Sequence, residues 1–558
     1  MAITVLDGKR FADMIFQGFH HLSENAKNVD ALNVFPVPDG DTGTNMKLTM
    51  NSGANEVKNH LQDHIGNVGK ALSKGLLMGA RGNSGVILSQ LFRGFAKAIE
   101  EKESLDAMEF AKALNAGVET AYRAVMKPVE GTILTVAKDA AKKAMETAAK
   151  EKDLAVVMEK TLLAAKESLS RTPDLLPVLK EVGVVDSGGQ GLVYVYEGFL
   201  AALKGEKPQG LSDPSAVMEQ LVKKEHHKTV QSFMDTEDIQ FGYCTEFMVK
   251  LEEEKLKAHP FSEEKFRRDL NRFGDSLLVI HDNGFVKVHI HSEQPGEVLS
   301  YGQRYGSLTN IKIENMREQH SNIVSSDREA PVPRPAAKPR SEYGIVTVSM
   351  GSGIRDLFLS IGAQEVIEGG QTMNPSTEDI AKAVERVNAK TVFILPNNKN
   401  IILAAEQAAS LFEQQAIVIP TKTVPQGLAA LLAFNPAKDA EWNKKAMNEA
   451  ANKVKSGQVT FAVRDTSIDG ISIKKDDYMG ILDGKIVVNH KDLLEAAKAL
   501  LEKMVDGESE ILTILTGEQA TDEQVEQLEN FVGEKYPDVE IEIHNGKQPL
   551  YPFIFAVE

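Results

Sequence analysis

The stretch Asn33-Val-Phe-Pro-Val-Pro-Asp-Gly-Asp-Thr-Gly-Thr-Asn-Met46 interrupts a region whose sequence is otherwise helical, and it decides how the chain is interpreted. Asp39 and Asp41 lie two residues apart on a glycine-rich turn, so both carboxylates can face one hard cation. Hydroxyl and amide groups follow directly at Thr42, Thr44 and Asn45. This pattern predicts a site for magnesium and phosphate; the alternative is a polar turn that only caps the next helix.

A second glycine-rich loop, Gly75-Leu-Leu-Met-Gly-Ala-Arg-Gly-Asn-Ser-Gly85, precedes an apolar helix. Its glycines let backbone N–H groups approach an anion closely, and Ser84 lies where the helix begins. The loop lacks the Gly-Lys-Ser or Gly-Lys-Thr ending of a Walker A motif, and no Gly-x-Gly-x-x-Gly follows a strand here. We therefore expect a phosphate cradle of another type, with a plain helix cap as the alternative.

Two more glycine-bearing loops, at residues 127–135 and 183–191, give weaker signals. Gly131 and Thr132 are expected to start a helix, and residues 186–189 to form a flexible turn. Either loop can bind a ligand or serve only the fold.

Apolar residues recur at helical spacing throughout residues 8–205, which predicts an all-α domain whose loops carry the chemistry. The middle domain has the element order βαββαβ, which is ferredoxin-like. In the C-terminal domain, near-continuous apolar strands separated by amphipathic helices predict an α/β domain with a parallel sheet. The predicted parts after the helical domain are a connector at 206–240, the middle domain at 241–324, a proline-rich linker at 325–341 and the C-terminal domain at 342–558.

Charge and composition exclude several classes of protein. The chain has 63 lysines and arginines against 80 aspartates and glutamates, a formal net charge of −17, which disfavours nucleic acid as a partner. Its apolar stretches are too short for a membrane span, and its N-terminus lacks a signal pattern. The single cysteine rules out an intrachain disulfide. We expect a cytoplasmic protein.

That cysteine, Cys244, lies on the first predicted strand of the middle domain, and His289 and His291 lie two apart on the third. Alternate residues of a strand share a face, and these two strands are neighbours in a ferredoxin-like sheet, so the three side chains can converge. Zinc accepts such ligands, although a closed site needs four. The alternative is a small buried cysteine with no metal.

Two features of the C-terminal domain are interpreted as structural. Ser349-Met-Gly-Ser-Gly353 follows a strand but departs from the Gly-x-Ser-x-Gly pattern of serine nucleophiles. Trp442 and the aromatic tail Tyr551-Pro-Phe-Ile-Phe555 are expected to lie in the core.

Taken together, the four loops resemble the nucleotide-binding domain of dihydroxyacetone kinases, of the DhaL type, in their order and in their helical background. The whole chain resembles the catalytic subunits of bacterial fatty acid kinase. The resemblance to that family includes the middle domain and two C-terminal motifs, Gly369-Gly-Gln-Thr-Met-Asn-Pro-Ser376 and Leu395-Pro-Asn-Asn-Lys-Asn400.

The resemblance implies an ATP-dependent kinase that phosphorylates the carboxylate of a fatty acid held by a separate DegV-family protein of the FakB type. The product would be an acyl phosphate for phospholipid synthesis. It further implies a homodimer, a DegV-like C-terminal domain, and a middle domain that shares the cysteine and both histidines.

The resemblance also assigns roles to residues. Asp39 and Asp41 match the aspartates that hold magnesium on the ATP phosphates. Dihydroxyacetone kinases carry a third metal aspartate upstream, for which Asn33 is the best substitute here, with Asp30 behind it. The other nucleotide-binding residues so assigned are Thr42, Thr44, Asn45, Gly82, Asn83, Ser84 and Thr132.

This chemistry needs no strong general base, because a fatty carboxylate is already ionised at neutral pH. Two alternatives remain. One is a kinase for a small hydroxyketone such as dihydroxyacetone, although the domain that holds such a substrate through a histidine is not found in the sequence. The other is a nucleotide-sensing regulatory scaffold.

Overall fold

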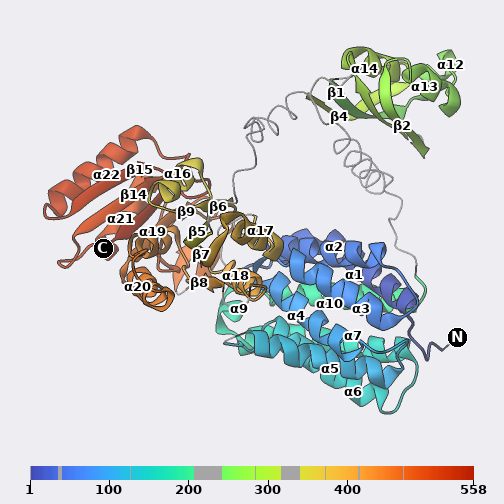
Figure 1. Cartoon of the computed structure of the whole chain (residues 1–558), viewed down its shortest axis with the longest axis horizontal. Coiled ribbons are helices and arrows are strands. Elements are labelled where there is room, and N and C mark those ends of the chain that lie inside the picture. Colours follow the sequence, from blue (N-terminus) through green and yellow to red (C-terminus); the bar gives the residue numbers. More distant parts are fainter. Residues whose placement is uncertain are drawn as a thin grey trace. The chain divides into compact units, whose positions relative to one another are not determined.

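The computed structural model describes residues 2–34, 40–125, 127–206, 242–282, 285–315, 340–370, 373–412, 415–468 and 470–558. It divides into two compact units, one made of Met1–Lys207 with Pro339–Glu558 and the other of Pro208–Lys338 (Figure 1). The predicted connector after residue 206 and the predicted linker up to residue 339 lie outside the described residues.

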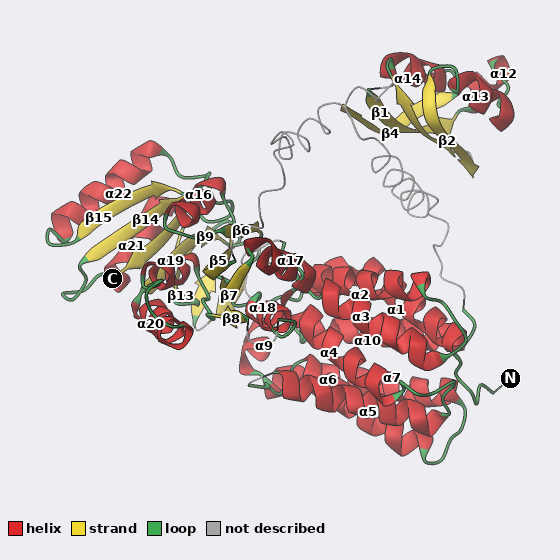
Figure 2. Cartoon of the chain, viewed as in Figure 1, coloured by secondary structure: helices red, strands yellow, loops and turns green. Residues whose placement is uncertain are grey.

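The N-terminal part is helical, as predicted (Figure 2). Among its described residues the one strand-like pairing is a single bridge between Leu6 and Leu105. None of the helices in the described part of the chain combines the length and apolar character needed to cross a membrane. The helices are α1 (Gly8–Asp30), α2 (Thr42–Asn59), α3 (Ile65–Gly79), α4 (Gly82–Ala98), α5 (Ala107–Ala124), α6 (Ile133–Ala148), α7 (Leu154–Ser170), α8 (Thr172–Leu175), α9 (Pro177–Val182) and α10 (Ser187–Leu203).

Aromatic side chains fill the centre of this helical domain. Phe95 stacks on Phe11 with ring centroids 5.2 Å apart and meets Phe110 edge to face at 5.8 Å. All three rings are buried, so each contributes on the order of 2–3 kcal/mol of hydrophobic stabilisation. This packing holds α4, whose N-terminus is part of the site described below, against α1 and α5.

The middle unit is one antiparallel sheet with strand order β2-β3-β1-β4. The order of its elements along the chain is the predicted one, with helix α12 added. Phe247, Phe266 and Ile290 form part of its core. Its elements are β1 (Tyr243–Leu251), α12 (Glu253–Ala258), α13 (Glu263–Leu270), β2 (Gly274–Asp282), β3 (Phe285–Ser292), α14 (Pro295–Gln303) and β4 (Gly306–Asn315).

The C-terminal part begins with the predicted parallel sheet, in the order β6-β5-β7-β8. Its strands are β5 (Ser341–Ser349), β6 (Glu365–Glu368), β7 (Ala389–Leu395) and β8 (Ala416–Val418). The helices of this half are α16 (Ser352–Ser360), α17 (Thr377–Val387), α18 (Ile402–Ala409), α19 (Val424–Leu432) and α20 (Ala440–Lys453).

A second sheet, which the prediction of one parallel sheet missed, follows in the order β13-β12-β9-β16-β14-β15. Only β14 and β15 pair in parallel within it. Its sequence signal is Asp483-Gly484, two residues with positive φ that close the hairpin of β12 and β13. The elements are β9 (Lys455–Phe461), β12 (Tyr478–Leu482), β13 (Lys485–His490), α21 (Leu493–Met504), β14 (Ile511–Thr516), α22 (Asp522–Lys535), β15 (Glu540–Asn545) and β16 (Phe553–Val557), with a separate ribbon of β10 (Thr466–Ile468) and β11 (Ile471–Ile473).

The expectations for the aromatic residues had different outcomes. Phe553 and Phe555 are fully buried on β16, as expected. The expectation that Trp442 is a core residue was wrong, because its side chain is 44% exposed on α20. The Lys438 ammonium lies 5.6 Å from the centroid of the Trp442 ring, an arrangement that suits a surface indole.

The C-terminal domain packs on the helical domain through α17 and α18, which contact α3 and α4. Ala80 and Val86 of the helical domain share one apolar cluster with Val346 and Ile380. At the centre of this contact lies Gln407, which is 7% exposed. Its amide donates to the Leu77 carbonyl at 2.8 Å and accepts from Gln90 at 2.9 Å. The interface therefore combines an apolar cluster with a satisfied buried amide.

We expect Gln407→Leu to weaken the contact between the two domains. The leucine has a similar volume but leaves the buried Gln90 amide and the Leu77 carbonyl without their partner, which costs about 1–3 kcal/mol. The apparent melting temperature should fall by about 2–5 °C. The exposed Gln527→Leu on α22 serves as control. An equal change in both variants would contradict the assigned role of Gln407.

Candidate functional site

A cavity of about 690 Å³ opens where the N-termini of α2, α4 and α10 meet the C-terminal domain. A helix N-terminus presents backbone N–H groups and a partial positive charge, so three such ends around one space favour an anionic ligand. The helical domain contributes to the lining Asn33, Val34, Asp41, Thr42, Asn45, Asn83, Ser84, Leu179, Asp186 and Ser187.

Asp41 occupies the N-cap position of α2, but its side chain makes no cap hydrogen bond. That role belongs to Asp30, whose Oδ1 accepts from the backbone N–H groups of Gly43 at 2.6 Å and Thr44 at 3.1 Å. The Thr44 hydroxyl donates to Asp30 Oδ2 at 2.9 Å. Asp41 therefore does not cap the helix with its side chain, as the alternative for the aspartate pair would require. The residue is 9% exposed and lines the cavity.

The second glycine-rich loop brings Gly82 and Asn83 against the start of α2. Gly82 has φ +58°, and a Cβ there would lie 2.6 Å from Asn45 Nδ2, so only glycine fits. Asn83 Oδ1 is buried and has no hydrogen-bond partner among the described residues. The N-terminus of α4 has no side-chain cap at Arg81. This end of the cavity therefore offers uncapped backbone amides beside an oxygen that lacks a partner.

Residues 186–189 are not the flexible turn that was expected; Asp186 is the N-cap of α10 and the next three residues form its first turn. The carboxylate accepts from the Gly189 N–H at 2.7 Å. Burial raises the pKa of Asp186 to about 6, against the lowering effect of hydrogen bonds from Gly189 and Ile133. Ser187 follows, and its hydroxyl lies 3.3 Å from that of Thr42. The ends of α2 and α10 are thereby joined.

The cations that line the cavity come from the C-terminal domain. Among the described lining residues, the helical domain supplies no lysine or arginine, whereas the C-terminal domain supplies Lys399, Lys422, Lys453 and Lys455, along with the acid Asp483. Lys455 pairs with Asp506 at 2.5 Å. Lys399 and Lys422 follow β7 and β8, at the carboxyl edge of the parallel sheet, where α/β proteins commonly bind ligands.

The C-terminal domain also holds both glycine-rich loops directly. Asn374 Nδ2 donates to Asp41 Oδ2 at 2.6 Å, and Arg81 Nη1 donates to the Asn374 carbonyl at 2.7 Å. Arg81 also pairs with Asp379 at 3.3 Å. Burial alone would raise the pKa of Asp379, but hydrogen bonds from Ser376 and the charge of Arg81 bring it below its usual value.

Arg464 performs a similar role on the first loop. Its guanidinium donates to the carbonyls of Ala31 at 2.8 Å, Asn33, and Val34 at 3.3 Å. Burial lowers the pKa of Arg464. The chain entering the aspartate loop is thus fixed from the C-terminal domain.

The predicted site residues divide into three groups. Asp39 lies outside the described residues. Thr44, Gly82 and Thr132 are not in the cavity lining, and the Thr132 hydroxyl donates to the Val129 carbonyl at 2.8 Å. The predicted residues that the fold brings together around the cavity are Asn33, Asp41, Thr42, Asn45, Asn83 and Ser84.

Sequence reasoning missed the residues that other parts of the chain bring to this site. Asp186 lies in a loop that was noted but not assigned a role, and Lys399 lies in one of the two C-terminal motifs. Asn374 lies in the other motif. No pattern in the sequence linked these positions to Asp41.

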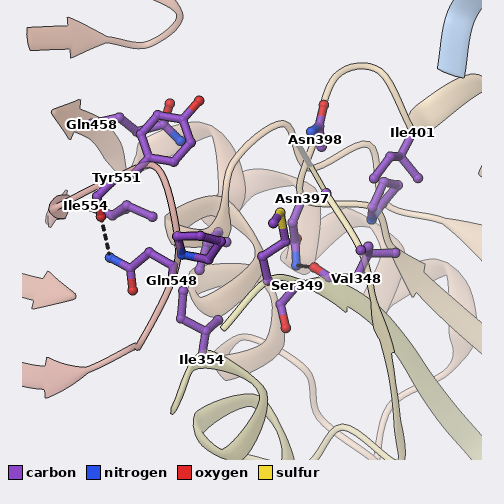
Figure 3. Close-up of a pocket in the computed structure, with 16 residues that line it drawn as sticks. Val348, Ser349, Ile354, Asn397, Asn398, Ile401, Gln458, Gln548, Tyr551 and Ile554 are labelled. Atoms are coloured by element: carbon purple, nitrogen blue, oxygen red, sulfur yellow. Dashed lines mark hydrogen bonds between the residues drawn. The ribbon is translucent and has the colours of Figure 1, made fainter. Parts of the chain in front are cut away.

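A second, much smaller pocket of about 40 Å³ lies inside the C-terminal domain (Figure 3). Gln548, Tyr551 and Ile554 line one side, and Val348 and Asn397 line the other. The Ser349 hydroxyl at this pocket is buried and has no hydrogen-bond partner among the described residues. The volume is that of one or two water molecules, so this pocket cannot enclose a long acyl chain.

In the middle unit, the backbone register places Cys244 directly opposite His291, with His289 opposite Glu246. His291 is buried. The side chains of Cys244 and His289 lie outside the described part of the structure. Within the described residues, no group of three histidines, cysteines or acids is arranged to hold a metal.

The residues at the large cavity fit a magnesium–nucleotide complex. Magnesium takes oxygen ligands. Asp41 lines the cavity together with Asn83, and the Asn374 Nδ2 donates to the Asp41 carboxylate. The amide oxygens of Asn83 and Asn374 are both buried and have no hydrogen-bond partner among the described residues. The N-terminus of α4 suits phosphate, and the facing lysines suit its charge.

Comparison with known proteins gives matches over nearly the whole chain. Residues 36–201 match the DAK2 domain, residues 240–323 the middle domain and residues 344–558 the C-terminal domain of the FakA-like family of fatty acid kinase subunits. Protein YloV of Bacillus subtilis (strain 168) is 63% identical, with 100% of both chains covered.

Two solved structures show partial similarity. A DegV family protein, Cg2579 from Corynebacterium glutamicum, has 14% identity and a TM-score of 0.31 over 39% of this chain and 96% of that one. The dihydroxyacetone kinase from C. freundii, in complex with AMP-PNP and Mg2+, has 20% identity and a TM-score of 0.28 over 34% of this chain and 33% of that one.

The raised pKa of Asp186 predicts a pH-dependent effect of Asp186→Asn. Because burial favours the protonated carboxyl, the folded chain binds this proton more tightly than the unfolded chain, and the native group destabilises the fold as pH rises from about 4 to about 6. Asparagine keeps the N-cap without the charge. The variant should therefore gain melting temperature relative to the native chain over that range, measured without nucleotide or metal.

Asp492→Asn, at the exposed N-cap of α21, controls for the change of capping residue. A difference in melting temperature between Asp186→Asn and the native chain that stayed constant from pH 4 to pH 7.5 would contradict the prediction.

Proposed function

The chain belongs to the FakA-like family of fatty acid kinase subunits, and we propose that it transfers the γ-phosphate of ATP to the carboxylate of a fatty acid presented by a separate DegV-family protein. The observation that carries this proposal is the cavity of about 690 Å³, where helix N-termini and Asp41 face lysines of the C-terminal domain. One cavity thus contains helix N-termini that can bind phosphate, a carboxylate that can bind a cation, and lysines that can neutralise the charge of the phosphates.

Each side of the cavity has its own task in this proposal. The uncapped N-terminus of α4, with Asn83 and Ser84, binds phosphate oxygens through backbone amides. Asp41 and the undescribed Asp39 hold magnesium, which when bound offsets charge on the β- and γ-phosphates. Lys399 and Lys422 line the same cavity from the C-terminal domain and attract the triphosphate.

The transfer itself requires positioning more than acid–base catalysis. A carboxylate oxygen of the fatty acid forms a bond to the γ-phosphorus as the bond to the bridging oxygen of ADP breaks, giving acyl phosphate and ADP. The acceptor is ionised at neutral pH and releases no proton, so no general base is needed. The absence of a histidine among the described lining residues is compatible with this reaction.

The small pocket of the C-terminal domain is not suited to hold the fatty acid. The pocket inside the C-terminal domain has a volume of about 40 Å³, far less than a long acyl chain occupies. We therefore assign the acid to a partner protein of the DegV family, and the acyl phosphate to phospholipid synthesis. We further propose that the middle domain has a ferredoxin-like fold with a zinc site at Cys244, His289 and His291, and that the C-terminal domain has a DegV-like fold. The protein is proposed to be a cytoplasmic homodimer.

The other two functions receive less support. A dihydroxyacetone-type kinase uses the same nucleotide domain, but the family match extends over the middle and C-terminal domains as well. A nucleotide-sensing scaffold would bind ATP through the same groups, so it is the match to fatty acid kinase subunits that favours phosphate transfer.

The decisive experiment combines the chain with ATP, Mg2+ and a DegV-family protein loaded with fatty acid, and traps acyl phosphate as the hydroxamate with hydroxylamine. We expect hydroxamate only when all components are present. Asp41→Asn should lower the rate by roughly 10²–10³-fold, because it removes a charge that holds the metal. Full activity of Asp41→Asn would contradict the assigned site, and ATP binding without any transfer would favour the sensing scaffold.

The lysines opposite the helix N-termini predict a selective loss of triphosphate affinity. Lys422→Met and Lys399→Met should each weaken AMP-PNP binding by about tenfold and ADP binding by less, since their charge is assigned to the terminal phosphate. Isothermal titration calorimetry with both nucleotides measures the ratio. Lys503→Met, on an exposed position of α21, is the control. Equal weakening of ADP and AMP-PNP binding would contradict the assignment of these lysines to the terminal phosphate.

A further inference from the structure

Asn374 is a buried residue that joins the C-terminal domain to the aspartate loop. Its side chain is 1% exposed, and its Nδ2 donates to Asp41 Oδ2 at 2.6 Å. The Arg81 guanidinium holds its carbonyl at 2.7 Å. Two residues further on, Ser376 caps α17, and the Thr377 N–H donates to the Ala80 carbonyl at 3.1 Å. The backbone around Asn374 is therefore fixed against the second glycine-rich loop.

The other end of the Asn374 amide is not satisfied. Its Oδ1 is buried and has no hydrogen-bond partner among the described residues. Buried polar atoms are nearly always paired, because leaving one without a partner in the protein interior is unfavourable. A direct contact between two domains would require only the Nδ2 bond, so the orphaned oxygen needs another explanation.

The surroundings of this oxygen indicate a cation. Asp41, which binds the amide nitrogen, is a candidate magnesium ligand, and the second orphaned oxygen, Asn83 Oδ1, belongs to the adjacent loop. An ideal Cβ on Gly82, the neighbour of Asn83, would lie 3.5 Å from Asn374 Nδ2. A carboxylate and neutral amide oxygens are the ligand types that hard cations accept.

We propose that Asn374 completes the magnesium site from the C-terminal domain: its Nδ2 orients Asp41, and its Oδ1 is an additional metal ligand. This inference rests on the proposed function and deepens it, because the site then exists in full only when the C-terminal domain is docked on the helical domain. It also adds a ligand to a loop that lacks the third aspartate of dihydroxyacetone kinases.

Binding of Mn2+ with ADP tests the proposal without any turnover, and electron paramagnetic resonance measures the free Mn2+. Asn374→Leu removes both polar atoms and should weaken Mn2+ binding about tenfold or more. Gln527→Leu, at an exposed position of α22, is the control and should leave Mn2+ affinity within about twofold.

Asn374→Asp separates a metal ligand from a purely structural hydrogen bond. The new carboxylate faces Asp41, so without metal the two like charges should lower the melting temperature. With Mn2+ and ADP the loss should be largely reversed, and Mn2+ affinity should equal or exceed that of the native chain. A structural role predicts the same loss with and without Mn2+.

Three results would overturn the inference. Two are native Mn2+ affinity in Asn374→Leu and a metal-independent loss of stability in Asn374→Asp. The third is absence of Mn2+–ADP binding by the native chain, which would also overturn the proposed kinase function. The first two results would leave Mn2+–ADP binding by the native chain intact. They would therefore overturn the role of Asn374 without overturning the proposed kinase function.

Discussion

The hydrogen bond from Asn374 to Asp41 joins residues that are 333 positions apart in the chain, and the organisation of the site depends on the docking that it represents. A buried carboxylate is stable only when donors or cations surround it. The helical domain uses Asp30 to cap α2 and leaves Asp41 directed at the cavity wall. The C-terminal domain then holds the loops on both sides through Arg464, Asn374 and the partners of Arg81.

This arrangement separates the two electrostatic requirements of phosphoryl transfer. The wall formed by the helical domain carries helix N-termini with Asp41 and Asp186, and the wall formed by the C-terminal domain carries the lysines with one acid, Asp483. Neither wall alone can both bind magnesium and offset the charge of a triphosphate. The apolar cluster around Val86 and the buried Gln407 keep the two walls at a fixed spacing. The fold of the C-terminal domain thus serves the site even though its own pocket is small.

The proposed function also divides the work between proteins. Holding a long acyl chain requires a deep apolar tunnel, whereas transferring phosphate requires a polar, charged cavity. A chain that contributes the charged cavity can act on an acid whose carboxylate reaches it from a separate protein. The volume of about 690 Å³ leaves room for more than a bare phosphate group, and the lining is rich in hydroxyl, amide and charged groups.

Local sequence patterns determined much of this protein. Helical spacing predicted the N-terminal domain, and the alternation of elements predicted the order in the middle unit. The two glycine-rich loops singled out Asp41 and Ser84, which both line the cavity, whereas Asn83 was assigned through the family resemblance. These features depend on contacts within a few residues, which periodicity and turn chemistry encode. The Asp483-Gly484 hairpin shows that a local signal for the second sheet was also present but was not used.

Only the tertiary structure decided which distant residues meet. Asp30 and Asp41 are both acids near one loop, and their different roles follow from the packing of α1 against α2. Lys399 and Lys422 reach the cavity, and Asn374 reaches Asp41, because β6, β7 and β8 end at the same edge of a sheet that is docked on the helical domain. Such contacts arise from the complementarity of whole domain surfaces, for which no short stretch of sequence carries the information.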